Sequence, residues 1–214
     1  MPVDQPLYPV NLIVAGRSCL VVGGGRVAVA KVQGLVEAGA RVTVVAPEVD
    51  TRIAALADAG RLVVERRRYR RGDVRGHRFA IAATGDPAVN QRVYDDGEAA
   101  GVFVNSADDP ERCSATLPAR VRQGRLTVTV STGGHSPAVA AWLRQRLADE
   151  LGPEYDQLIG LLSEARKEVQ ARGVSTEKLD WRRALDSGIL DLVRAGRLED
   201  AKERLRACLS SSSD

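Results

Sequence analysis

The sequence is poor in aromatic residues, histidine and cysteine. Phe, Trp and Tyr make up 4% of the 214 residues, which argues against a protein that binds nucleic acid by stacking on its bases. The three cysteines, Cys19, Cys113 and Cys208, are far apart and show no CxxC or Cys/His spacing. They therefore support neither a disulfide framework nor a zinc site. The two histidines, His77 and His135, have no acid or nucleophile at a catalytic spacing.

Long apolar runs and a strong charge bias are also absent. No stretch of 18 apolar residues occurs, and MPVDQPLYPV at the start lacks the basic and apolar regions of a signal peptide. We expect a cytoplasmic protein that binds no membrane. A net charge of +3 does not indicate binding to nucleic acid. Two local basic clusters, RRRYRR at 66–71 and Arg120, Arg122 and Arg125, are typical of surfaces that attract anionic ligands.

What the sequence does contain is an alternation of short apolar runs and helical segments from Ser18 to Asn105. This pattern predicts α/β architecture with a Rossmann-like parallel sheet. The expected strands are Cys19–Val22, Val42–Val45, Leu62–Val64, Phe79–Ala83 and Val102–Asn105. The expected helices between them are Arg26–Ala38, Asp50–Ala59 and Ala88–Ala100.

Beyond Asn105 the pattern changes. The segment ATLPARVRQGRLTVTVST predicts two strands around Gln123 and Gly124, because threonines and valines alternate after the turn. A small sheet has edges to cover, which favours a two-fold partner. The remaining segments are expected to be helical, at Pro137–Glu150, Pro153 to about Arg172, Ser175–Leu185 and Leu198–Cys208.

The segment VVGGGRVA carries a dinucleotide-binding pattern. Gly23, Gly25 and Ala28 form G-x-G-x-x-A directly after a predicted strand and directly before a predicted helix. Gly23 permits the tight turn, Gly25 lets a pyrophosphate approach the backbone, and Ala28 allows the helix to pack closely on the strand. The alternative is a structural glycine turn in a Rossmann-like fold that binds no cofactor.

The second strand ends without the acidic residue that usually binds the ribose hydroxyls. Val45 and Ala46 occupy that place, and Glu48 is the only nearby carboxylate. Glu48 either binds the ribose or is a solvated loop residue. No arginine directly follows the strand, which favours NAD over NADP.

Candidates for catalysis are few. No Tyr-x-x-x-Lys pair exists; His77 is expected to pack near a strand start, and His135 to be a loop residue. Asp108 and Asp109 follow the fifth predicted strand, at the edge where open α/β sheets bind ligands. One of them either accepts a proton or holds a cation beside a nicotinamide, or the pair forms a plain turn with Pro110.

The ordered segments CLVVGGGRVAVAK, AIAATGDPAVNQRV, FVNSADDPERC and LTVTVSTGGHSP carry a family resemblance. From about Tyr8 to Leu147 the chain resembles the precorrin-2 dehydrogenase and sirohydrochlorin ferrochelatase family, the N-terminal module of siroheme synthases. Members oxidise precorrin-2 with NAD, and some also insert ferrous iron. The resemblance implies an NAD-binding Rossmann domain over 1–115, a dimerisation region over 116–150 and a helical domain over 151–214.

The resemblance also implies roles for individual residues. The family's active-site aspartate falls on Asp108. The implied cofactor contacts, with the turn glycine, are Gly23, Gly25, Arg26, Val27, Pro47, Glu48 and Thr84. The implied substrate contacts are Asn105, Thr132, Gly133 and Gly134, and Arg120 joins them because a tetrapyrrole with many carboxylates needs cationic partners. The segment Thr132–Gly134 also fits an anion-binding turn, and the alternative is a plain turn. No permanent metal ligands are needed, because the macrocycle supplies its own nitrogens.

We therefore expect a homodimeric NAD-dependent enzyme that oxidises precorrin-2 to sirohydrochlorin. A bifunctional enzyme that also takes ferrous iron as a substrate fits the same sequence. The alternative from another class is a regulatory NAD sensor without catalysis, against which stands the lack of a DNA-binding helix pair. The sequence shows no methyltransferase domain, so the chain is not expected to make its own precorrin-2.

Overall fold

The computed structural model describes residues 6–107 and 109–210, and it divides into two compact units. The first unit contains the chain up to Leu117 together with Thr132–Ser136. The second contains Pro118–Ser131 and the chain from Pro137 onward. The expected division into three regions remains a prediction. No helix in the described ranges is long and apolar enough to span a membrane.

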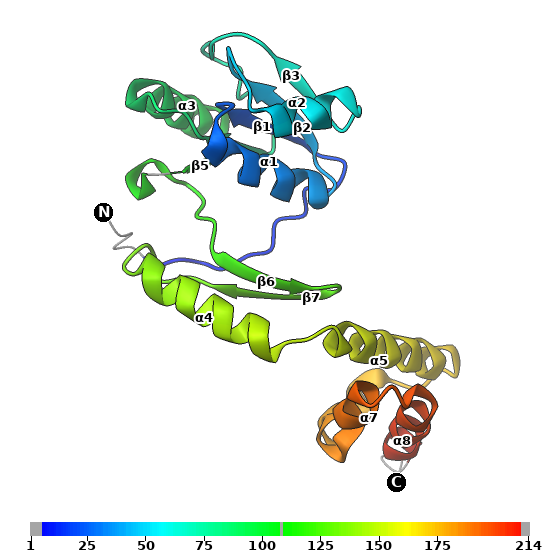
Figure 1. The fold of residues 1–214 in the computed structure, drawn as a ribbon. Helices are drawn as coiled ribbons and strands as arrows, with labels where there is room; N and C mark the ends of the chain where they lie inside the picture. Colours follow the sequence, from blue (N-terminus) through cyan, green and yellow to red (C-terminus); the bar gives the residue numbers. More distant parts are fainter. Residues whose placement is uncertain (1–5, 108, 211–214) are drawn as a thin grey trace. The chain divides into compact units, whose positions relative to one another are not determined.

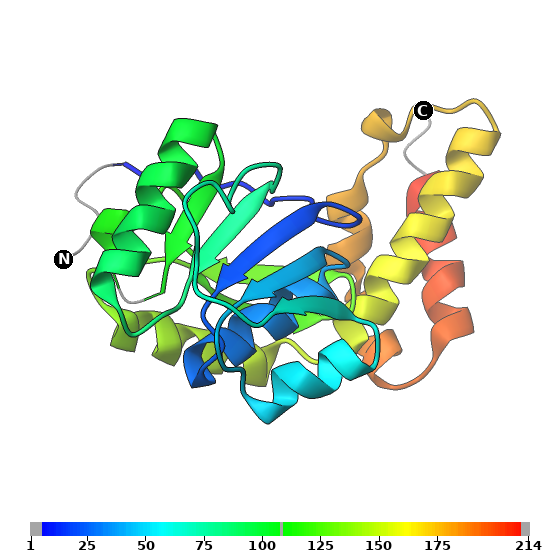
Figure 2. The same ribbon diagram turned by 90° about the horizontal axis from the view of Figure 1, so that it is seen from above.

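The core of the first unit is a sheet of five parallel strands in the order β3-β2-β1-β4-β5, which lie side by side in Figure 2. The strands are β1 (Ser18–Val22), β2 (Arg41–Val45), β3 (Leu62–Glu65), β4 (Phe79–Ala82) and β5 (Phe103–Ser106). This order confirms the predicted Rossmann-like fold, and it reverses direction between β1 and β4. Ligands of such sheets bind at that switch point, outside the carboxyl ends of the strands.

Helices cover both faces of the sheet (Figure 1). The helices are α1 (Arg26–Glu37), α2 (Thr51–Asp58) and α3 (Pro87–Ala100). Val32 of α1 and Ile53 of α2 are buried in one apolar cluster with Val44. Val93 of α3 is buried in the cluster on the other face with Val104. Strands covered on both faces are apolar throughout, which is why these segments are continuous apolar runs rather than alternating ones.

The outer edge of β5 is occupied by the chain itself. The backbone N–H groups of Ser114 and Ala115 donate to the Val104 carbonyl, at 2.9 and 3.0 Å. The Val104 N–H in turn donates to the Ser114 hydroxyl at 2.9 Å. The segment after β5 thus satisfies the hydrogen-bonding groups that an edge strand would otherwise expose.

The connection between β3 and β4 contains no helix and carries the arginine-rich run. Arg67 is paired with Asp73 at 2.6 Å, and the Tyr69 hydroxyl donates to Asp96 at 2.7 Å. Burial, reinforced by this hydrogen bond, raises the pKa of Tyr69. Val74 is fully buried. The carboxylates of Asp73 and Asp96 therefore hold the connection in place through Arg67 and Tyr69.

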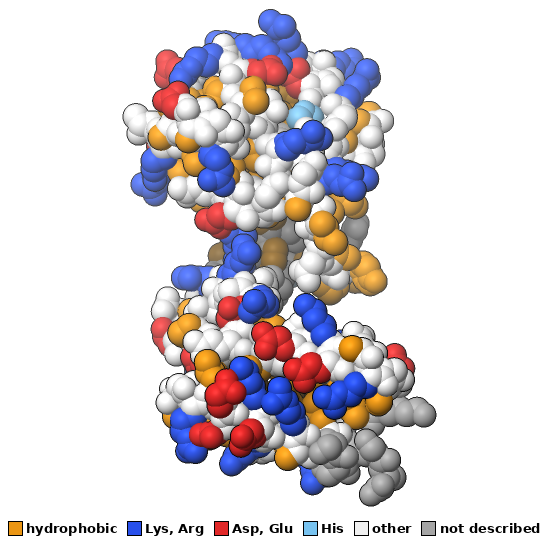
Figure 3. All heavy atoms as spheres, turned by 90° about the vertical axis from the view of Figure 1, so that its right-hand side faces the viewer, with side chains coloured by type: hydrophobic (Ala, Val, Ile, Leu, Met, Phe, Trp, Pro, Cys, Tyr) orange, Lys and Arg blue, Asp and Glu red, His pale blue; other side chains and the backbone are white. Residues whose placement is uncertain are grey.

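The second unit combines a β-hairpin with helices. The strands β6 (Ala119–Gln123) and β7 (Leu126–Val130) pair antiparallel through Gln123 and Leu126, as predicted. The helical segments are α4 (Pro137–Glu150), α5 (Glu154–Ala171), η2 (Thr176–Lys178), α6 (Trp181–Ala184), η3 (Leu185–Ile189), α7 (Leu190–Arg194) and α8 (Leu198–Ser210). Acidic and basic side chains are interspersed over these helices in the lower part of Figure 3, which is typical of a solvated surface.

The predicted helix at Ser175–Leu185 is correct from Trp181 onward and wrong before it. The chain forms the short turn η2, breaks before Asp180, and then runs helically from α6 through α7 with a bend at Gly188, whose φ is +81°. Asp180 starts this run, because its carboxylate accepts a hydrogen bond from the Arg183 N–H at 2.9 Å. Ile189 and its neighbours are buried against α8, and this packing stabilises a helix that the sequence pattern did not reveal.

Candidate functional site

Most of the predicted cofactor residues follow the carboxyl ends of adjacent strands. Gly23 follows β1, Pro47 and Glu48 follow β2, and Thr84 follows β4. The carboxyl ends of parallel strands lie along one edge of the sheet, so these residues lie around the switch point between β1 and β4. Asn105 is near the end of β5 on the same edge.

Two of the three consecutive glycines are required by the fold. Gly23 has a φ of +114°, and a Cβ there would overlap the carbonyl oxygen of Ala83. A Cβ on Gly24 would overlap the carbonyl oxygen of Glu48. The Asp50 N–H also donates to the Gly24 carbonyl at 2.8 Å. Gly24 therefore joins the glycine loop to the segment after β2, a role that the G-x-G-x-x-A pattern does not reveal.

Gly25 differs from its neighbours because a Cβ there would meet nothing within 4 Å. It stands at the start of α1 with a φ of −80°, and no side chain caps the helix there. Arg26 and Val27 are exposed, whereas Ala28 is fully buried against the sheet. Open space next to uncapped N–H groups at a helix start fits a phosphate group. The loop therefore fits the pyrophosphate of a dinucleotide.

The segment after β2 contains two carboxylates with different surroundings. Hydrogen bonds from the Arg52 side chain and backbone lower the pKa of Asp50 to about 2. Asp50 is thus engaged as the cap of α2. Glu48 is exposed and has no ion pair with any residue that the structure describes. Of these two carboxylates, Glu48 is the one available to a ligand.

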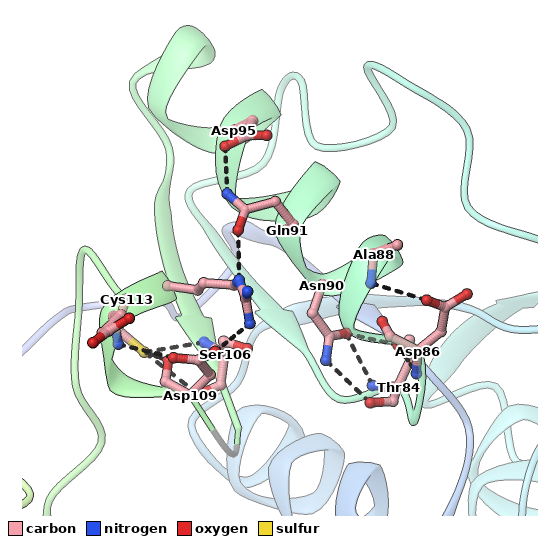
Figure 4. A network of polar contacts seen from close by, with 11 residues as sticks. Thr84, Asp86, Ala88, Asn90, Gln91, Asp95, Ser106, Asp109 and Cys113 are labelled. Carbon is pink, nitrogen blue, oxygen red and sulfur yellow. Dashed lines mark hydrogen bonds and ion pairs between the residues drawn. The ribbon is translucent and has the colours of Figure 1, made fainter. Parts of the chain in front are cut away.

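Thr84 is held by α3, as Figure 4 shows. Its hydroxyl donates to the Asn90 Oδ1 at 2.7 Å, and the Asn90 Nδ2 donates back to the Thr84 carbonyl at 3.1 Å. Asp86 caps α3 by accepting a hydrogen bond from the Ala88 N–H at 2.9 Å. The loop after β4 is therefore fixed in position. Asn90 is a contributor that sequence reasoning missed, although it lies in the family motif.

A thiol joins the two ends of the loop after β5. The Cys113 Sγ accepts a hydrogen bond from the Ser106 N–H at 3.2 Å and lies 3.3 Å from the Asp109 carbonyl oxygen. Burial raises the pKa of Cys113, so the sulfur keeps its proton and can also donate. Asn105 is 6% exposed, and its Nδ2 donates to the Ala115 carbonyl at 3.0 Å. Both side chains hold the loop on β5.

Asp108, the predicted catalytic residue, lies outside the described residues. The neighbouring Asp109 accepts a hydrogen bond from the Glu111 N–H at 3.1 Å and is paired with Arg112. The Arg112 Nε donates to the Gln91 Oε1 at 2.5 Å, which extends this network to α3 (Figure 4). Asp109 is thus engaged in loop structure, which argues against Asp109 as a proton acceptor.

The predicted substrate turn belongs to the first unit. The His135 N–H donates to the Thr132 carbonyl at 3.0 Å, and the Ser136 N–H donates to the Thr132 hydroxyl at 3.2 Å. Gly133 and Gly134 adopt φ values of +59° and +81°. Glycine is favoured at both positions because this left-handed region is costly for other residues.

Two further sequence candidates are not in the loops that follow the carboxyl ends of the parallel strands. Arg120 is exposed on β6 of the second unit, opposite Thr129. His77 precedes β4 at its amino end, and its Nδ1 is hydrogen-bonded to the Ser18 hydroxyl at 3.0 Å. Burial lowers the pKa of His77, so a neutral, structural imidazole is expected at neutral pH.

Comparison with known proteins adds the family. Residues 10–119 match a family described as putative NAD(P)-binding, and residues 123–150 match the central part of sirohaem biosynthesis proteins. A solved structure, "SirC, precorrin-2 dehydrogenase", is 31% identical, with a TM-score of 0.74, over 94% of this chain and 98% of its own. This chain belongs to the precorrin-2 dehydrogenase family.

Curated relatives in the family are longer. A siroheme synthase of Stutzerimonas stutzeri is 40% identical over 194 residues, and one of Nitrosococcus oceani is 36% identical over 203 residues. These alignments cover 90% and 94% of this chain but only 42% and 43% of the relatives. The chain thus corresponds to less than half of each siroheme synthase, and to nearly all of the precorrin-2 dehydrogenase.

Proposed function

We propose that the chain is an NAD-dependent dehydrogenase that oxidises precorrin-2 to sirohydrochlorin. The observation that carries the proposal is the open, uncapped start of α1 at Gly25, at the switch point of a chain that covers 98% of a precorrin-2 dehydrogenase. Bound NAD supplies the hydride acceptor. The other hydrogen leaves the substrate as a proton, so the reaction needs a base.

We assign the binding of the cofactor to residues at the carboxyl ends of β1, β2 and β4. The N–H groups at Gly25 bind the pyrophosphate, and exposed Arg26 and Val27 flank it. Glu48 accepts hydrogen bonds from the ribose hydroxyls, beside Pro47. Thr84 closes the cofactor site after β4.

Asp108 is the proposed base for the departing proton, or it orients the ring. Its neighbour Asp109 is engaged with Arg112, which supports Asp108 as the acting carboxylate of the pair. The proposed substrate contacts are Asn105, Arg120, Thr132, Gly133 and Gly134. A tetrapyrrole with many carboxylates favours cationic and N–H donors among such contacts.

We also propose that the protein acts as a homodimer. Among the described residues, β6 and β7 pair only with each other, so each has an outer edge that a second copy could cover. A cytoplasmic location remains the expectation from sequence. Ferrous iron is a candidate second substrate, because the curated relatives are named siroheme synthases.

The test uses purified protein, enzymatically generated precorrin-2 and NAD under anaerobic conditions. We expect NADH and sirohydrochlorin to form in equal amounts, and ferrous iron is added only after this oxidation is complete. Siroheme formation faster than in a protein-free control would establish the chelatase. Asp108→Asn should lose most of its turnover, whereas the control Asp58→Asn, an exposed residue of α2, should keep it. Tight NAD binding without any NADH would favour the sensor alternative.

A further inference from the structure

Lys31 on α1 is a charged residue that the proposed mechanism does not use. It is the only lysine among residues 1–150, where every other strongly basic side chain is arginine. It is three residues after Ala28 and four before Leu35, both buried on the sheet. Residues at these spacings share a face of the helix, so Lys31 lies at the border of the buried stripe. It is half-buried.

The surroundings of Lys31 place it near the end of β5. Burial raises the pKa of Cys113, and the positive charge of Lys31 acts in the opposite direction on the same thiol. Ala115 packs against the apolar cluster that contains Ala28, on the α1 side of the sheet. Helical side chains lean toward the helix N-terminus, which carries the ammonium toward the carboxyl edge. Lys31 therefore lies within electrostatic range of Cys113, where the loop after β5 ends.

The ammonium has no counter-charge within the described part of the chain. No hydrogen bond or ion pair joins Lys31 to another described residue, and Asp109 is engaged with Arg112. On β5, at the start of the same loop, the Asn105 Oδ1 is fully buried and finds no hydrogen-bond partner in the described ranges. A charge removed from water without a partner is unfavourable. An anionic ligand would compensate the charge of Lys31. The unpaired Asn105 Oδ1 shows that the protein alone does not satisfy every polar group at the end of β5.

We propose that Lys31 binds a carboxylate of the acidic tetrapyrrole substrate, and this inference rests on the proposed function. The alternative anion is the cofactor pyrophosphate, whose candidate position is Gly25. Lys31 is six positions after Gly25, about 9 Å along the helix axis. The location beside the β5 loop favours the substrate, because that loop carries the proposed catalytic segment. A lysine ammonium is a compact point charge, which suits a single carboxylate oxygen.

The test measures binding of two probes separately, sirohydrochlorin by anaerobic absorbance titration and NAD by calorimetry. Lys31→Gln and Lys31→Met should both raise the dissociation constant of sirohydrochlorin about tenfold at low salt. Lys31→Arg keeps the positive charge, so it should retain part of the affinity that these two variants lose. The NAD affinity should change less than twofold. Arg41→Gln, which removes one exposed positive charge at the amino end of β2, is the matched control and should bind both probes as the parent protein does.

Four results would overturn the inference. Unchanged sirohydrochlorin affinity in both Lys31 variants would remove it while leaving the dehydrogenase proposal intact, provided that the parent protein still produces NADH. A loss of NAD affinity instead would assign Lys31 to the cofactor. If Arg41→Gln raised the dissociation constant of sirohydrochlorin as much as the Lys31 variants do, the affinity would depend only on the overall charge of the protein. If the parent protein neither binds sirohydrochlorin nor produces NADH, this inference and the proposed function fail together.

Discussion

The three consecutive glycines should separate folding from cofactor binding when each is replaced by alanine. At Gly25 the added Cβ enters open space, and a φ of −80° is allowed for alanine. We expect Gly25→Ala to change the free energy of unfolding by less than about 0.5 kcal/mol. The methyl group would occupy the space assigned to the pyrophosphate. The dissociation constant of NAD should therefore rise at least about tenfold, which is about 1.4 kcal/mol.

At Gly24 the same change acts on the fold. The Cβ would lie 2.8 Å from the Val49 Cγ1 and 2.9 Å from the Val49 Cα, besides overlapping the Glu48 carbonyl. Overpacking of this kind costs about 1–3 kcal/mol. For a chain of this length, 1 kcal/mol corresponds to about 2–4 °C in melting temperature. Gly24→Ala should therefore melt several degrees below the parent protein.

The assay pairs thermal melting with calorimetric titration of NAD for both variants. We expect opposite profiles: Gly25→Ala is stable but binds NAD weakly, and Gly24→Ala is less stable. A Gly25→Ala protein that binds NAD with the parent affinity would refute the assignment of this space to the pyrophosphate. A Gly24→Ala protein with the parent melting temperature would refute the close approach between the glycine loop and the segment after β2.

Three other predictions concern the surrounding scaffold. Because the pKa of Tyr69 is raised in the folded state, its contribution to stability is complete below the unfolded-state pKa of about 10 and is lost at higher pH. Tyr69→Phe should therefore reduce the fall in the urea midpoint between pH 9 and pH 11. An unchanged fall would contradict the burial of this hydroxyl. Gly97→Ala should destabilise by about 1–3 kcal/mol in urea unfolding, because its Cβ would overlap Val104; the control Gly85→Ala, with open space around it, should not. Arg112→Gln should increase hydrogen exchange of amides in the loop after β5, because it removes the ion pair with Asp109; unchanged protection would show that the pair does not order this loop.

The sequence predicted the first unit and the hairpin of the second unit well because their signals are local. Strands buried on both faces give apolar runs, and the hairpin turn at Gly124 is marked by glycine. The helical run around Gly188 could not be read in this way, since a glycine at φ +81° interrupts the pattern. Its stability comes from packing of residues such as Ile189 and Leu205, which are distant in sequence.

The same limit applies to the candidate site. The spacing of Gly23, Gly25 and Ala28 predicted the loop from sequence alone. The need for Gly24 depends on a carbonyl 24 residues away, and nothing in the sequence pattern pairs the two. The bond between Cys113 and the Ser106 backbone was equally hidden, because a single cysteine among loop residues has no pattern of its own.

The self-pairing of Val104 with Ser114 and Ala115 has a consequence for how copies of the protein can associate. A parallel sheet with a free outer strand can recruit strands from neighbouring molecules and polymerise without limit. Here the β5 side of the sheet is closed by the chain that leads to the hairpin. Molecules in a crowded solution cannot extend the sheet from that side, so an ordered assembly must form through other surfaces.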